Sequence, residues 1–193
     1  MKFENSFDVS LPPTEAWPVL MDIERIAPCM PGATLIELVN DKTFKGTVSV
    51  RLGPVALTFE GNASFEDVDD TAHTANVKAQ GRDPKGRGGA NATVTFRLEP
   101  SDTGSKVLIE TDLTLSGSVA QYGRGVGMIQ SVSSQLIGQF AKALEAEIAS
   151  DNATEEDLTA EEATPAAPKP QAISGFSLFF AALGSWFKGL FRK

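Results

Sequence analysis

Few residues of this sequence are suited to catalysis. Its 193 residues include one cysteine, one histidine and one tyrosine. Cys29 has no second cysteine with which to form a disulfide, and the sequence contains no metal-ligand spacing, nucleophile elbow or phosphate loop. We expect Cys29 to be a buried apolar residue in a turn, and His73 to occupy an outward-facing strand position. The sequence therefore predicts that the protein is not an enzyme.

Positive charge is also scarce. The sequence has 17 Lys and Arg against 25 Asp and Glu, which gives a net charge of −8. Because nucleic-acid binding requires clustered Lys and Arg, we do not expect a nucleic-acid partner. The N-terminal sequence MKFENSFDVS lacks the basic and apolar segments of a secretory signal, so we expect a cytoplasmic protein.

The C-terminal part of the chain differs in composition from the rest. Residues 151–170 are rich in Glu, Ala, Thr and Pro, with six acidic residues, one basic residue and one large aliphatic side chain, Leu158. Such a segment buries too little apolar surface to offset the entropy of ordering, so we expect an acidic disordered linker. Residues 171–193 carry three basic and no acidic residues. The expected organisation is a folded domain over residues 1–150, the linker, and a C-terminal tail.

The pattern of the folded domain predicts a mixture of strands and helices. A first strand around residues 3–9 precedes a short helix that begins at a proline and a second helical turn at residues 22–27. Apolar and polar residues then alternate over residues 33–118, and turn signals divide this stretch into six strands. Residues 119–149 change to a helical period. We therefore expect an α+β helix-grip fold, in which a curved antiparallel sheet wraps around a long C-terminal helix.

Small residues occupy many positions that this alternation places on the inner face of the sheet. They are Gly46, Gly61, Ala63, Ala75, Ala79, Gly81, Ala90, Ala92 and Thr111. The first half of the long helix is also rich in small residues, at Gly123, Gly125, Gly127, Ser131, Ser133 and Ser134. A filled core needs larger side chains, so one interpretation is an apolar cavity of about 300–1,000 Å³ that binds a hydrophobic small molecule. The alternative is that the glycines mark bends of a strongly curved sheet.

The predicted cavity would have an almost entirely hydrocarbon lining. Its residues would be Phe44, Val48, Phe59, Gly61, Val77, Ala92, Val94, Phe96, Tyr122, Arg124, Met128 and Ile129. The Tyr122 hydroxyl and the Arg124 guanidinium could orient a ligand by donating hydrogen bonds. Arg51 or Arg82 could do so at the rim, although arginines at such positions are also typical of a solvated surface. No residues suited to metal binding accompany them.

The tail at residues 171–193 has the pattern of an amphipathic helix. One side would carry its large apolar residues, which are Phe176, Phe179, Phe180, Leu183, Trp186, Phe187, Leu190 and Phe191. The uncharged run from Gln171 to Phe187 has 17 residues, whereas a membrane span needs about 20. We therefore expect the tail to lie in the membrane interface as a membrane-binding helix. The alternative is a helix that binds a partner's hydrophobic groove or another copy of itself.

Four segments resemble a known family. They are CMPGATLIEL at residues 29–38, FKGTVSVRLGPVALTFEG at 44–61, GRGGANATVTF at 86–96 and SGSVAQYGRGVGMI at 116–129. Together they are similar to the family of carbon monoxide dehydrogenase G subunits, within the START-like (SRPBCC) or Bet v 1-like helix-grip superfamily. The resemblance covers residues 1–150 and extends to the linker and the tail.

This resemblance implies a non-catalytic accessory protein with no covalent cofactor. Members of the family recruit a molybdenum-containing, carbon monoxide dehydrogenase-type enzyme to the inner face of the cell membrane, and related subunits accompany other molybdenum hydroxylases. They are also thought to bind a quinone, menaquinone or ubiquinone, and to carry it between the bilayer and the enzyme. One alternative is a membrane adaptor without a ligand. Another is a START-like enzyme, such as a cyclase, with acid and base groups inside its cavity.

Overall fold

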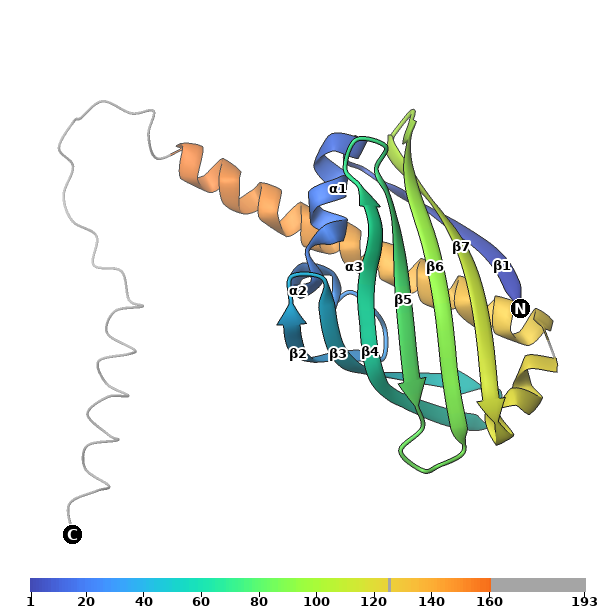
Figure 1. Ribbon diagram of the computed structural model, residues 1–193. Coiled ribbons are helices and arrows are strands. Elements are labelled where there is room, and N and C mark those ends of the chain that lie inside the picture. Colours follow the sequence, from blue (N-terminus) through green and yellow to red (C-terminus); the bar gives the residue numbers. More distant parts are fainter. Residues whose placement is uncertain (125, 161–193) are drawn as a thin grey trace, which may run out of the picture. The chain divides into compact units, whose positions relative to one another are not determined.

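The computed structural model describes residues 1–124 and 126–160, which form a curved sheet and four helical segments (Figure 1). β1 (Lys2–Val9) is followed by α1 (Pro13–Met21) and α2 (Ile23–Ile26). The next strands are β2 (Ala33–Asn40), β3 (Thr43–Leu52), β4 (Val55–Asp69), β5 (Thr74–Arg82), β6 (Gly88–Ser101) and β7 (Gly104–Gly117). A 3₁₀ helix, η1 (Ser118–Arg124), then leads into α3 (Val126–Ala160).

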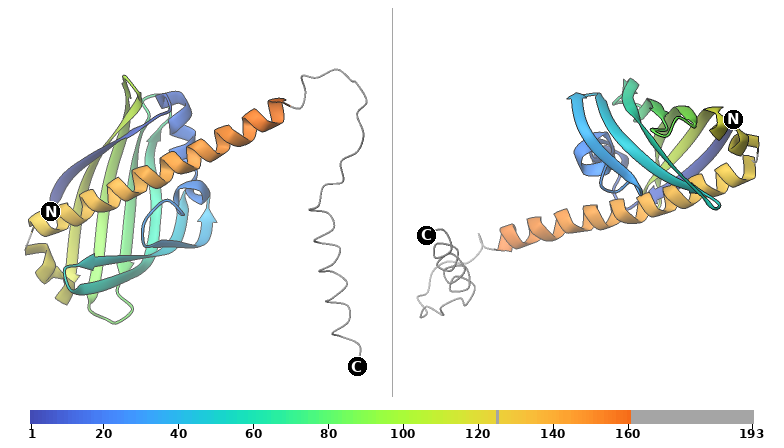
Figure 2. Two further views of the ribbon diagram at one scale, coloured as in Figure 1. Left: turned by 180° about the vertical axis from the view of Figure 1, so that it is seen from behind. Right: turned by 90° about the horizontal axis from the view of Figure 1, so that it is seen from below.

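The described strands form one antiparallel sheet in the order β1-β7-β6-β5-β4-β3-β2. The strands from β2 to β7 follow one another along the chain and are joined by short turns. β1 pairs with β7 and forms one edge of the sheet. α3 runs along the concave side of the sheet, as the two views in Figure 2 show. This arrangement confirms the expected helix-grip fold.

The two short helices begin where the sequence provides helix-start residues. α1 has a proline at its first turn, and its buried residues, Trp17 among them, face the sheet. The Asp22 carboxylate accepts hydrogen bonds from the backbone N–H groups of Glu24 and Arg25, at 3.0 and 3.2 Å, and so caps α2. Both helices therefore agree with the segments that the sequence predicts.

The bounds of the long helix differ from the expected residues 119–149. The chain from Ser118 to Arg124 is a 3₁₀ helix and α3 begins at Val126, because the glycines of this region disfavour α-helix. α3 continues to Ala160, so residues 151–160 are helical where we expected a disordered linker. Glu and Ala in this stretch are good helix formers, and adding residues to an existing helix costs less than starting one. The rest of the linker and the whole tail lie outside the described residues.

The apolar core consists of two separate clusters. The first lies between the sheet, α1, α2 and the second half of α3, and the second lies between the β3–β4 hairpin, η1 and the start of α3. The first contains Phe7, Val9, Ala16, Trp17, Val19, Leu20, Ile23, Cys29, Phe65, Ala75, Leu98, Val107, Ile109, Phe140, Leu144 and Ile148. The second contains Leu52, Leu57, Phe59, Val119 and Ile129.

Candidate ligand-binding site

The strand registers place the predicted small residues on one face of the sheet. Two neighbouring rows cross β3 to β6, and the side chains of both rows face the concave side. One row holds Gly46, Gly61, Gly81 and Ala90, and the next holds Phe44, Ala63, Ala79 and Ala92. The alternation of the sequence therefore predicted this face correctly.

The glycines and the alanines of these rows have different roles. A Cβ atom on Gly61 would lie 1.8 Å from the backbone oxygen of Gln80, and one on Gly46 would lie 2.8 Å from that of Thr34. Glycine is thus required where these strands approach each other closely, and β3 and β4 turn sharply along their length (Figure 1). For Gly46 and Gly61, the structure therefore favours the alternative interpretation, in which glycines mark bends of the sheet.

The alanine row lies between the two core clusters. Ala63, Ala79 and Ala92 belong to neither cluster and are half-buried. Val77 and Val94, beside them, pack against the first cluster and are also half-buried. The middle of the concave face is therefore apolar and still accessible to water.

The structure brings most of the predicted lining residues to this face. Those that are half-buried on the concave side or on η1 are Phe44, Val48, Gly61, Val77, Ala92, Val94, Phe96 and Tyr122. Phe59 and Ile129 are instead buried within the second cluster, and Met128 is 48% exposed. The side chain of Arg124 lies outside the described part of the chain, as do the eight predicted membrane-binding residues of the tail.

A polar contact that the sequence analysis missed holds α3 over the concave face. The Asn5 amide nitrogen on β1 donates a hydrogen bond to the Ser133 hydroxyl, and the Ser134 hydroxyl donates one to the Asn5 amide oxygen, both at 3.0 Å. These serines were expected only to leave space, whereas they anchor the helix. The available signal was a polar residue at an inward position of the first strand, between Phe3 and Phe7.

The second half of α3 is held by its acidic residues. The Glu145 carboxylate accepts hydrogen bonds from the backbone N–H and the hydroxyl of Ser10, both at 2.7 Å. Glu147 forms an ion pair with Arg25 of α2, with 3.5 Å between Oε1 and Nε. These polar contacts therefore fix α3 at several points along its length, in addition to its packing in the two core clusters.

Arg87 joins three segments at one end of the concave face. Its guanidinium donates hydrogen bonds to the Asp83 carboxylate and, at 3.3 Å, to the backbone oxygen of Ala56 in the β3–β4 hairpin. The Arg87 backbone oxygen accepts a hydrogen bond from the Ser118 hydroxyl at 2.7 Å. The hydrogen bond from Arg87 lowers the pKa of Asp83 below its ordinary value. The arginines predicted at the rim, Arg51 and Arg82, are exposed and make no such connection to a described residue.

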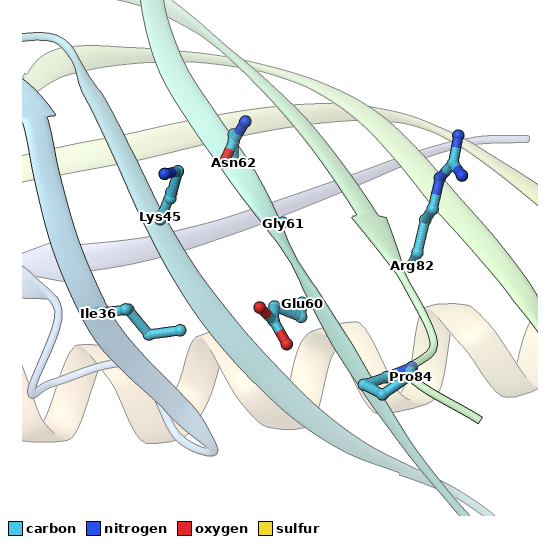
Figure 3. Close-up of a pocket in the computed structure, with 7 residues that line it drawn as sticks. All are labelled: Ile36, Lys45, Glu60, Gly61, Asn62, Arg82 and Pro84. Carbon is cyan, nitrogen blue, oxygen red and sulfur yellow. The ribbon is translucent and has the colours of Figure 1, made fainter. Parts of the chain in front are cut away.

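Two grooves of about 380 and 790 Å³ lie on the outer face of the sheet, which is the face away from α3. Figure 3 shows the smaller one, lined by Ile36, Lys45, Glu60, Gly61, Asn62, Arg82 and Pro84. The larger continues from the same residues over β5 and β6. Of the residues predicted to line an inner cavity, Gly61 alone borders these two grooves. Both grooves are therefore distinct from the concave face.

The two residues weighed as catalytic candidates have structural surroundings. Cys29 is buried in a turn, as predicted, and burial followed by the charge of Glu147 raises the pKa of its thiol. His73 lies in the turn before β5, with φ of 50°, and not on a strand as expected. Its ring packs on that of Trp17, with 5.6 Å between the centroids, at the end of the sheet that α1 covers. Neither residue faces the alanine row.

Neither a cluster of metal ligands nor a membrane-spanning helix is found in the described ranges. Over residues 1–124 and 126–160, no group of three or more His, Cys, Asp or Glu side chains could hold a metal ion. The helices within these ranges include none that is long and apolar enough to cross a bilayer.

The curved sheet, the long helix and the apolar concave face define a START-like or Bet v 1-like helix-grip protein. Among solved structures, this chain is similar to a conserved protein of Geobacillus kaustophilus, with a TM-score of 0.67 and 23% sequence identity. The match covers 78% of this chain and 96% of that protein. The Zhui aromatase/cyclase of Streptomyces sp. R1128 has a TM-score of 0.53 and 14% identity, over 76% and 92%. Ara h 8.0201 has a TM-score of 0.52 and 20% identity, over 78% and 98%.

The sequence itself matches one family. The model of the family of carbon monoxide dehydrogenase G subunits (CoxG) matches residues 6–149. This match spans most of the chain, and the chain therefore belongs to the CoxG family, as its four sequence segments predicted. A comparison with curated proteins gives no match.

Proposed function

We propose that the concave face binds an isoprenoid quinone, menaquinone or ubiquinone, and that the protein links a molybdenum-containing carbon monoxide dehydrogenase-type enzyme to the membrane. The observation that carries the proposal is the half-buried alanine row between two separate core clusters. A ligand that covers this apolar surface gains about 25 cal/mol for each Å² removed from water. Membership of the CoxG family supports the assignment of the enzyme partner.

In this proposal the domain carries its ligand and does not transform it. The inward positions of the described strands hold no Asp, Glu, His, Lys or Arg. General acid–base catalysis needs such a group within hydrogen-bond reach of the reacting atoms. Strand positions without such groups suit a carrier better than a cyclase.

Extraction of the purified full-length protein with organic solvent, followed by mass spectrometry, tests the carrier function. We expect an isoprenoid quinone in close to stoichiometric amount. An empty protein that still brings the dehydrogenase to lipid vesicles would support an adaptor without a ligand. A protein that neither holds a quinone nor brings the dehydrogenase to vesicles would contradict both parts of the proposal.

The proposal places the protein on the inner face of the cell membrane through residues 171–193. Eight apolar side chains that leave water at about 1.5–3 kcal/mol each give ample free energy for reversible binding to a bilayer. Deletion of this segment should abolish sedimentation with vesicles that contain anionic lipid, while the circular dichroism spectrum keeps the signature of the folded domain. A truncated protein that sediments as the full chain does would contradict the anchor. A full-length Leu183→Ala, Phe187→Ala variant, expected to bind more weakly, serves as the graded control.

A further inference from the structure

Polar side chains interrupt the apolar concave face at one place. The inward positions of β1 hold Phe3, Asn5, Phe7 and Val9, and those of β7 hold Ser105, Val107, Ile109, Thr111, Leu113 and Leu115. Phe3 pairs with Thr111 and Asn5 with Ile109, so Asn5 and Thr111 are diagonal neighbours on this face. Ser105 is different, since it is fully buried and donates a hydrogen bond to the Leu11 backbone oxygen.

This polar pair lies where the two core clusters separate. Phe7, Val107 and Ile109 belong to the first cluster, while Phe3 and Leu113 pack against the second. Thr111 pairs with Val94 of β6, and Leu113 pairs with Ala92, so the polar pair lies beside the alanine row at β7. Three strand spacings separate Thr111 on β7 from β4, which carries the far end of that row, and this corresponds to about 14 Å. The accessible middle of the concave face is therefore an apolar strip with one polar end.

Both side chains at this end have unused hydrogen-bond donors. The Asn5 amide nitrogen gives one of its two N–H groups to Ser133, and the other is not used by a described residue. The Thr111 hydroxyl is half-buried and makes no hydrogen bond within the described part of the chain. Two neutral donors next to each other suit an acceptor oxygen. Because the inward strand positions carry no cation, they suit a carbonyl better than a carboxylate.

We propose that Asn5 and Thr111 bind the carbonyl oxygen of the ligand's head group, while the apolar part of the ligand lies over the alanine row. This inference rests on the proposed carrier function and adds the residues that select the ligand. The selected class is a neutral molecule with a carbonyl at one end and a hydrocarbon body. A fatty acid is disfavoured because no side chain at the inward positions of the described strands carries a positive charge for its carboxylate.

Binding of two matched probes to the full-length protein tests the inference. One probe is a naphthoquinone with a short isoprenoid chain, and the other is the corresponding alkylnaphthalene, which lacks both carbonyls. Thr111→Val removes the hydroxyl at nearly constant volume, so we expect quinone binding about tenfold weaker and unchanged binding of the hydrocarbon, measured by equilibrium dialysis. Thr111→Ser, which keeps a hydroxyl, should restore most of the quinone affinity. Thr114→Val, on the outward face of the same strand, should bind both probes as the wild type does.

The role of Asn5 is tested against its contact with the helix. Asn5→Ala removes the amide and both of its hydrogen bonds to α3, whereas Ser133→Ala removes one of the two and leaves the amide in place. We expect Asn5→Ala to weaken quinone binding about tenfold and Ser133→Ala to have a smaller effect. Equal effects of these two variants on both probes would overturn a direct contact between Asn5 and the ligand.

The outcomes separate this inference from the proposed function. If the wild type binds neither probe, both are overturned. If the wild type binds both probes and Thr111→Val changes their affinities equally or not at all, the concave face binds apolar molecules and the polar pair does not select them. Loss of affinity for the quinone alone supports the inference.

Discussion

Ala92→Phe is expected to abolish quinone binding while the domain remains folded. Ala92 faces the concave side of β6, between Ala79 of β5 and Leu113 of β7, in the row that neither core cluster covers. A phenyl ring at this position would occupy the volume proposed for the ligand. The affinity for the quinone should fall by at least about tenfold, as measured by equilibrium dialysis with the short-chain naphthoquinone.

The stability of this variant is the critical companion measurement. If the strip is open, the ring enters free space and the midpoint of urea unfolding stays close to that of the wild type. If the protein's own side chains filled the strip, the ring would overpack it and lower the free energy of unfolding by about 1–3 kcal/mol or more. Thr93→Phe, one position along on the exposed face, is the size-matched control and should bind the quinone normally. A marked loss of stability in Ala92→Phe alone would contradict an open binding strip.

Gly61→Ala is expected to destabilise the domain severely, although it adds a single methyl group. The new Cβ atom would lie 1.8 Å from the Gln80 backbone oxygen and 2.7 Å from the Gly81 Cα atom, so β4 and β5 would have to separate. Neither atom belongs to a flexible side chain that could move away. We expect a loss of more than about 3 kcal/mol in the free energy of unfolding, measured by urea denaturation.

A second glycine provides the matched control. An added Cβ atom on Gly138 of α3 would meet nothing within 4 Å, and alanine favours helix by about 1 kcal/mol over glycine. Gly138→Ala should therefore unfold at a higher urea concentration than the wild type. If Gly61→Ala were as stable as the wild type, the close approach of β4 and β5 would not be a requirement of the fold.

The inner face of the sheet could be predicted from the sequence because a strand has a period of two. Once the turns were located, the alternation assigned Ala63, Ala79 and Ala92 to the same face, and the registers confirm it. The reason for a glycine was harder to predict. A glycine can stand where the core has a gap or where two strands approach closely, and the sequence looks the same in both cases. The distance from Gly61 to Gln80, which distinguishes the two, is known only from the structure.

Contacts between distant parts of the chain also escaped the sequence analysis. Asn5 and Ser133 are 128 residues apart, and no local pattern relates them. Arg87 was one of several arginines, and its contact with Ala56 depends on how two hairpins meet. The predicted strand position of His73 was wrong because the turn before β5 spans residues 70–73 and includes it.

The uncharged character of the inward strand positions has a consequence for how binding can be controlled. In the proposed carrier function, a neutral guest makes no titrating contact with these strand side chains, so we expect neither salt nor pH near neutrality to alter its affinity through them. Uptake and release then depend on shape and on how strongly the surrounding lipid competes for the same molecule.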